Sequence, residues 1–158
     1  MKQEIFVTKM KQAISDVFEI MLFQAVQFPD NSLRIADRMH QMRREDFLSG
    51  ATLAFEGSCP GIFYFLIPEQ AMGEMTSNFL GIDLNEITVE QKRDVVKEAL
   101  NMIGGKTLSH LEGGRFKLGL PALMDEDNPI DALLENPDAV HLLIEAEGSD
   151  FIAGFKLG

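Results

Sequence analysis

The segment from Thr88 to Gly105 most constrains the fold, because it predicts one helix with both a start and an end. Thr88 is followed three residues later by Gln91, the spacing of a capping box, in which each side chain bonds the other residue's free backbone N–H. Gly104 and Gly105 predict the end of the helix, since glycine readily takes the left-handed conformation of helix C-termini. Between these ends, apolar residues at helical spacing predict one buried face: Val96, Ala99, Leu100 and Ile103.

The opposite side of this helix carries a row of polar side chains. At about 100° per residue, Asp94, Glu98 and Asn101 fall within about 60° of one another. A surface helix needs a polar outer face, and most carboxylates there are simply solvated. The spacing alone therefore favours a solvated face, and a functional interpretation depends on the wider pattern.

A first helical pattern runs from residue 2 to about residue 28, with apolar side chains every three or four positions, and Pro29 ends it. Ser15, Glu19 and Leu22 repeat the spacing of the later polar row, with leucine in the asparagine position. The first two positions each lie 79 residues before their equivalents in that row. This duplicated spacing suggests an internal repeat.

A basic segment follows, from Arg34 to Glu45, and contains four arginines. It is compatible with a loop, a short helix or a strand outside the core. Its arginines favour a solvated connection, and the functional alternative is a patch that docks an acidic protein.

Two pairs of short apolar runs predict β-hairpins. Residues 47–56 and 62–67 are separated by a Gly- and Pro-containing turn, and residues 140–146 and 151–157 by Glu-Gly-Ser-Asp. The run Ile62–Ile67 is apolar on both faces, which predicts a central strand covered on both sides.

Between the first hairpin and the capping box, Glu69 to Leu80 predicts a helix that Gly81 ends. Its side chains expected to point inward are Met72, Met75, Phe79 and Leu80. The methionines are interpreted as core filler rather than as a cofactor site. Residues 128–134 predict a further short helix, because proline is favoured at a first helical position.

Arg115 to Leu120 predicts a short strand that runs into Pro121. The acidic cluster at 125–127 invites comparison with a calcium loop. An EF-hand loop needs glycine at its sixth position and glutamate at its twelfth, where this chain has Ile130 and Asn136. A calcium loop is therefore excluded.

These elements predict an α+β fold: an antiparallel-rich sheet with two long helices packed on it and a pseudo-twofold internal repeat. The length of 158 residues predicts a single domain over residues 1–158. The net charge of −11 argues against DNA, RNA or anionic lipid as a partner, because those partners attract basic patches. Solubility is sufficient to explain the acidity.

One cysteine, Cys59, excludes an intramolecular disulfide, and no zinc-type spacing is present. The N-terminus has no apolar signal, and no apolar run reaches the roughly 18 residues of a membrane span. We therefore expect a cytoplasmic protein.

The pattern Asp94-x-x-x-Glu98-x-x-Asn101 resembles the signature helix of the CheC/CheX/FliY family of bacterial chemotaxis phosphatases. That motif is Asp or Ser, three residues, Glu, two residues, Asn, and a proline a little over twenty residues later; here Pro121 follows Asn101 by twenty. The order of the other elements is similar to this family over nearly the whole chain. Because Leu22 replaces asparagine in the first helix, the chain is most similar to CheX-like members, which keep only the later site and form dimers.

The resemblance implies dephosphorylation of a phospho-aspartate on a CheY-like response regulator, with Asn101 positioning the attacking water. It implies that Glu98 pairs with a cationic side chain of the regulator, and that Asp94 and Lys97 contribute to partner binding. No metal or cofactor is expected from this chain, because the divalent cation belongs to the regulator.

Two other functions remain open. The first is a non-catalytic binding module of a chemotaxis or two-component signalling complex that keeps the fold. The second is a hydrolase built on His40, His110 or His141, although each histidine is isolated in the sequence and no serine or cysteine lies in a nucleophile motif.

Overall fold

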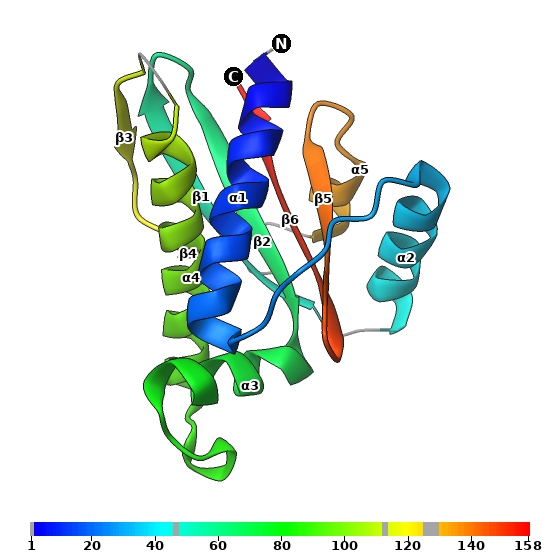
Figure 1. The fold of residues 1–158 in the computed structure, drawn as a ribbon, viewed down its shortest axis with the longest axis vertical. Helices are drawn as coiled ribbons and strands as arrows, with labels where there is room; N and C mark the ends of the chain where they lie inside the picture. Colours follow the sequence, from blue (N-terminus) through cyan, green and yellow to red (C-terminus); the bar gives the residue numbers. More distant parts are fainter. Residues whose placement is uncertain (1, 46–47, 112–113, 125–129) are drawn as a thin grey trace.

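The computed structural model describes residues 2–45, 48–111, 114–124 and 130–158. Figure 1 shows a single antiparallel sheet with helices on both of its faces. The helices are α1 (Lys2–Leu22), α2 (Ser32–Glu45), α3 (Glu69–Leu80), the short 3-10 helix η1 (Leu84–Glu86), α4 (Val89–Ser109) and α5 (Ile130–Glu135). The strands are β1 (Leu48–Gly57), β2 (Gly61–Pro68), β3 (Phe116–Leu118), β4 (Ala122–Leu123), β5 (Val140–Ala146) and β6 (Ser149–Leu157).

The strand order is β3-β1-β2-β6-β5, and β4 also pairs with β1. The two predicted hairpins, β1–β2 and β5–β6, are both confirmed and lie side by side through the antiparallel pairing of β2 with β6. From Phe63 to Pro68 every residue of β2 is buried, as expected for a central strand covered on both faces.

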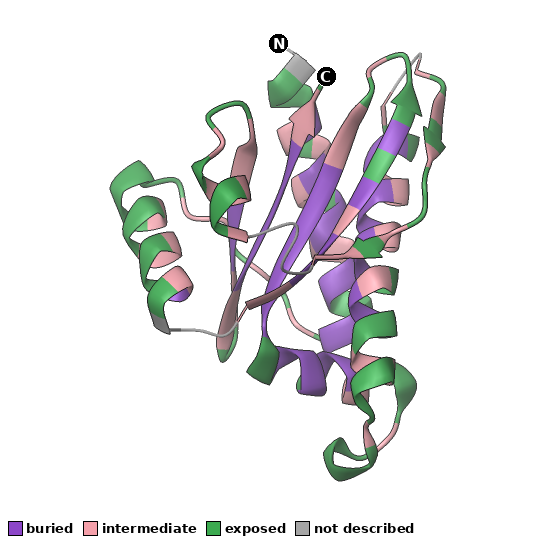
Figure 2. Ribbon diagram, turned by 180° about the vertical axis from the view of Figure 1, so that it is seen from behind, coloured by how far each residue is buried: buried purple, intermediate pink, exposed green. Residues whose placement is uncertain are grey.

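The main core lies between one face of the sheet and the helices α1, α3 and α4. Its largest element is a set of phenylalanines, in which Phe18 of α1 packs edge-on against Phe65 of β2 and Phe151 of β6. A smaller cluster covers the second face, where Met42 of α2 packs with Tyr64 and other apolar side chains. Figure 2 shows the resulting pattern, with buried residues concentrated in the central strands and on the inner sides of α1 and α4.

The first helix is shorter than the sequence predicts, since α1 ends at Leu22 and not near residue 28. Phe23 has a positive φ of 56°, which takes the chain out of the helix. The chain then pairs with the edge of β5, where the backbone of Gln27 and Glu145 exchanges two hydrogen bonds of 2.9 and 2.8 Å.

The basic segment forms the helix α2, one of the three alternatives that the sequence left open. It is not a solvated connection, because Arg34 pairs with Glu145 and Arg38 lies 2.6 Å from Asp150. Arg43 adds two further ion pairs, to carboxylates of α5. The functional alternative, a patch that docks an acidic protein, stays a prediction, and carboxylates of the same chain already pair with these three arginines.

The predicted helix Glu69–Leu80 is confirmed, and Gly81 ends it in the left-handed conformation. Met72 and Met75 are buried, but Phe79 and Leu80 are exposed, contrary to the prediction. The reason is that α3 lies across the lower ends of α1 and α4, so that its last turn extends past the core (Figure 1).

The acidic cluster at 125–127 lies outside the described residues.

No helix in the described parts of the chain has the length and apolarity required to cross a membrane.

Candidate functional site

The N-terminus of α4 is fixed by the predicted capping box. The Thr88 hydroxyl accepts a hydrogen bond of 3.1 Å from the Gln91 backbone N–H, and the Gln91 side chain accepts one of 3.0 Å from the Thr88 N–H. Two backbone donors that a helix start leaves free are thereby satisfied. The cap therefore sets the register of every side chain along α4.

One side of α4 is buried against α1, α3 and the sheet. Its buried residues are Val95, Val96, Ala99, Leu100, Ile103, Gly104, Thr107 and Leu108. The four apolar residues predicted to face the core all belong to this set.

The polar row lies on the outer side of α4. Asp94 and Glu98 are exposed, and Asn101 is half-buried. Lys97 bends back to Asp94, with its Nζ 3.6 Å from Oδ1. An exposed pair three residues apart on a helix contributes only a few tenths of a kcal/mol. The pair therefore orients two charges beside the row and contributes little to folding.

The helix does not end at Gly104 and Gly105, as the sequence predicted, but continues to Ser109. A Cβ atom at Gly104 would lie 2.7 Å from a methyl carbon of Leu53 and 3.1 Å from the ring of Phe63. Gly104 is thus required for the close approach of α4 to the sheet, and not for a C-cap. Helical spacing places Gly105 on the outer side, one turn after Asn101, so α4 itself contributes no side chain at that position.

The proline twenty residues after Asn101 lies between two short strands at the edge of the sheet. β3 pairs with residues 55–57 of β1 and β4 with residues 51–52, and Pro121 lies in the interval between them. Leu53, one of the two β1 residues in that interval, is the residue over which Gly104 packs. Pro121 therefore lies beside the part of α4 that begins at Asn101.

The first helix holds no second copy of the row. The Ser15 hydroxyl donates to the carbonyl of Lys11, a bond within α1 of 3.0 Å. Glu19 is exposed, whereas Leu22 is only 5% exposed and belongs to the core. Of α1 and α4, only α4 carries the complete polar row.

The histidines do not form a hydrolase site with the neighbours that the structure describes. His40 and His110 are exposed, on α2 and at the end of α4. His141 is half-buried, and its ring bonds the hydroxyl of Tyr64 and the carbonyl of Leu134 instead of a serine or a cysteine.

A family model described as "Chemotaxis phosphatase CheX" matches residues 49–143, which begin in β1 and end in β5. The matched segment includes the whole of α4 and is more than half of the 158 residues. The chain belongs to the CheX family. No curated protein matches it at the level of sequence.

Solved structures give the same assignment at the level of the fold. The chemotaxis protein CheX from Vibrio vulnificus superposes with a TM-score of 0.73 at 14% identity, with 97% of this chain and 96% of that one covered. CheX from Desulfovibrio desulfuricans gives 0.67 at 16% identity, covering 97% and 99%. CheX from Borrelia burgdorferi, solved as a CheX–CheY–BeF₃–Mg²⁺ complex, gives 0.64 at 15% identity, covering 96% and 97%.

The fold predicted from the sequence, including its resemblance to CheC and CheX, is confirmed by these superpositions. The family assignment agrees with the resemblance first suggested by the signature row on α4.

Proposed function

We propose that this chain hydrolyses the phospho-aspartate of a CheY-like response regulator at the polar row of α4. Three observations support the proposal. The family is that of the chemotaxis phosphatase CheX, a CheX of the same fold forms a complex with a CheY, and the row is exposed to a partner. The exposed row carries the proposal, because a motif buried in the core could not reach a phosphoryl group on another protein.

In this reaction the oxygen of a water molecule attacks phosphorus, and the bond from phosphorus to the aspartate oxygen breaks. The products are the free carboxylate and inorganic phosphate, and the water's proton passes to phosphate or solvent. Such transfers depend on positioning and charge stabilisation more than on covalent chemistry by the protein. No metal or cofactor of this chain is needed, and the divalent cation is proposed to be the regulator's own.

Asn101 is proposed to orient the water. Its carboxamide oxygen can accept a hydrogen bond from the water, and its NH₂ group can donate one to a phosphoryl oxygen, without adding negative charge beside the phosphate. Half-burial on a capped helix restricts its side chain, which lowers the entropy lost when the water is fixed.

Glu98, one turn before Asn101, is proposed to pair with a cationic side chain of the regulator and so hold the helix in register. Asp94 and Lys97, which pair at 3.6 Å, are proposed to contact the regulator at the near end of the row. Glu98, Asp94 and Lys97 are thus proposed to bind the regulator and not to take part in the reaction, since all three precede Asn101 along α4.

We also propose that the protein is a cytoplasmic homodimer, as the family resemblance implies. β5 is the last strand of the sheet, and in the described chain its outer edge carries one isolated bridge, from Gln27 to Glu145. An open strand edge is a common surface for pairing with a second chain. Sedimentation velocity would give the mass directly, and a monomer at micromolar concentration would contradict this part.

The decisive experiment follows the decay of a phosphorylated CheY-like regulator with and without the protein, then with Asn101→Ala. We expect wild type to accelerate the decay and the variant to lose at least about a hundredfold of that acceleration. Asn85→Ala, at an exposed asparagine of η1, is the matched control and should behave as wild type. Thermal unfolding of each variant checks the fold.

No acceleration by wild type would contradict the proposal and favour a binding module that has kept the fold. Equal acceleration by wild type and Asn101→Ala would instead remove Asn101 from the chemistry.

A further inference from the structure

The edge of the sheet beside α4 has a bulge at residues 119–121, which we call the edge bulge. Pro121 has no backbone N–H and cannot donate to β1, which favours a break in the ladder at this position. β3 and β4 pair with β1 on either side of the bulge, and Leu53 and Ala54 of β1 lie between the two ladders. Bulges of this kind at sheet edges redirect a side chain.

Here the redirected side chain is that of Leu120, which is 90% exposed. Its backbone is held in place. The Gly119 N–H donates to the carbonyl of Ala54 at 2.8 Å, and the Met124 N–H donates to that of Gly50 at 2.9 Å. Leu120 thus stands out from a fixed part of the sheet, and its exposure does not come from a loop leaving the molecule.

The edge bulge lies beside the polar row of α4. Leu118, two residues before Leu120, has a methyl carbon 3.7 Å from the position of a Cβ at Gly105. Leu53, beside the bulge, is in turn covered by Gly104. Both neighbours on α4 are within one turn of Asn101. Figures 1 and 2 agree that the chain after β3 runs beside α4 at the edge of the sheet, and Figure 2 shows much of it as exposed.

Single exposed apolar side chains are common and need no function. Leu33, which is 77% exposed on α2, is such a case, and it lies on the opposite side of the sheet from the α4 row. Leu120 differs in its position: a partner that lies on α4 and reaches Asn101 also covers the edge bulge. A rigid apolar side chain loses little entropy when it is buried in an interface, so it can contribute strongly to binding.

We propose that Leu120 is an apolar anchor for the regulator, packing against the regulator's surface when α4 reaches the phospho-aspartate. This inference rests on the proposed function, and it adds an apolar contact to the charged contacts of Glu98. This role was not predictable from the sequence, because the segment from Arg115 to Leu120 predicted a plain strand. The nearest signal was the proline at 121, which interrupts the ladder.

The test measures regulator affinity and the dependence of dephosphorylation on regulator concentration for Leu120→Ser, Leu120→Met and Leu33→Ser. We expect Leu120→Ser to raise the Kd and KM about tenfold and to leave kcat within twofold of wild type, because Leu120 does not touch the reacting atoms. Leu120→Met should restore binding, and Leu33→Ser should match wild type. Thermal unfolding should be nearly unchanged, since an exposed side chain is replaced.

The outcomes separate this inference from the proposed function. Wild-type turnover with an unchanged KM and Kd in Leu120→Ser would overturn the anchor alone. Binding without turnover in wild type would contradict the phosphatase, and a weaker Kd for Leu120→Ser would still support the anchor. Equal losses in Leu120→Ser and Leu33→Ser would also overturn it, because the effect would then not be specific to the edge bulge.

Discussion

The hydroxyl of Tyr64 on β2 reaches the ring of His141 on β5, across the strand that separates them. The residue between them on β6 is Gly154, which is paired in register with both. A Cβ atom at Gly154 would lie 2.3 Å from the Tyr64 hydroxyl oxygen. The absence of a side chain at this one position therefore permits a polar contact between two strands that are not neighbours.

Burial favours the neutral form of both titratable groups of this contact. Burial raises the pKa of Tyr64 well above its ordinary value of 10.0. Burial also lowers the pKa of His141 from 6.5, although a hydrogen bond to the Leu134 carbonyl opposes part of that effect. His40 and Arg43 of α2 line the same cavity and add no negative charge that would favour the imidazolium form.

The stability of the protein should consequently decrease in mild acid. Unfolded His141 takes up a proton near pH 6.5, whereas the folded side chain resists protonation to a lower pH. Between these values the unfolded state binds more protons, so the free energy of unfolding falls as the pH falls below about 6.5. Urea unfolding between pH 5 and 8 would measure this, with His141→Gln expected to have the shallower slope.

His110→Gln is the control for that experiment, because His110 is exposed at the end of α4 and does not line the cavity of His141. Identical slopes for wild type and His141→Gln would mean that the burial of His141 does not control the response to acid.

The two glycines inside α4 should respond in opposite directions to alanine. At Gly104 a methyl group would overlap Leu53 and Phe63, which should destabilise the protein by about 1 to 3 kcal/mol. At Gly105 the nearest atom is 3.7 Å away, so alanine should stabilise the helix by up to about 1 kcal/mol. Denaturant unfolding of the two variants tests this, and destabilisation of both by similar amounts would show that the helix needs flexibility at both positions.

These glycines also show which parts of α4 a sequence can predict. The capping box at Thr88 depends on residues three apart, so the start of the helix was predictable from local chemistry. Its end was not, because Gly104 is inside the helix for a tertiary reason, the contact with Leu53. The exposed row followed from helical periodicity, but the position of the edge bulge beside it depends on strand pairing between segments more than sixty residues apart.

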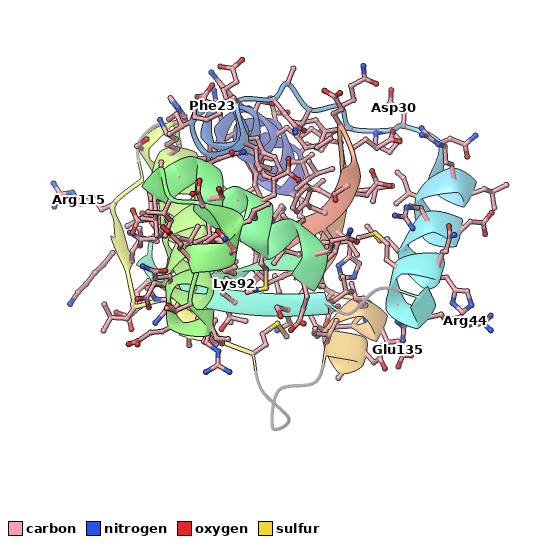
Figure 3. All side chains as sticks on the ribbon, turned by 90° about the horizontal axis from the view of Figure 1, so that it is seen from below. Phe23, Asp30, Arg44, Lys92, Arg115 and Glu135 are labelled. Atoms are coloured by element: carbon pink, nitrogen blue, oxygen red, sulfur yellow. The ribbon has the colours of Figure 1, made fainter. Side chains whose placement is uncertain are left out.

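The same distinction applies to α2. Its arginines suggested a solvated connection or a docking patch because their acidic partners lie about a hundred residues further along the chain. Only the folded sheet brings Arg38 next to Asp150. Figure 3, viewed from below, shows α2 standing beside the sheet, well apart from α4, which carries the row.

Reversal of charge at Glu98 should weaken binding of the regulator. Glu98→Lys replaces an acceptor for a cationic side chain with a like charge, so we expect the Kd to rise at least about tenfold at low salt and the difference to shrink as salt is added. Glu90→Lys, at an exposed carboxylate of the first turn of α4, carries the same change in net charge. If both variants lost affinity equally, the effect would come from net charge and not from Glu98.

A second site should not arise from restoring the missing asparagine of α1. Leu22 lies in the core at 5% exposure, whereas Asn101 is half-buried on an outer face. Leu22→Asn would bury a carboxamide among apolar side chains and leave a cavity, which should cost about 2 to 5 kcal/mol of stability. Its side chain would also point away from a partner, so the variant combined with Asn101→Ala should show no phosphatase activity.

The double variant is compared with Asn101→Ala alone in the regulator decay assay, at a temperature where circular dichroism shows both to be folded. Activity above that of Asn101→Ala would mean that α1 can present this position outward, and that the two helices are closer to equivalent than their burial indicates.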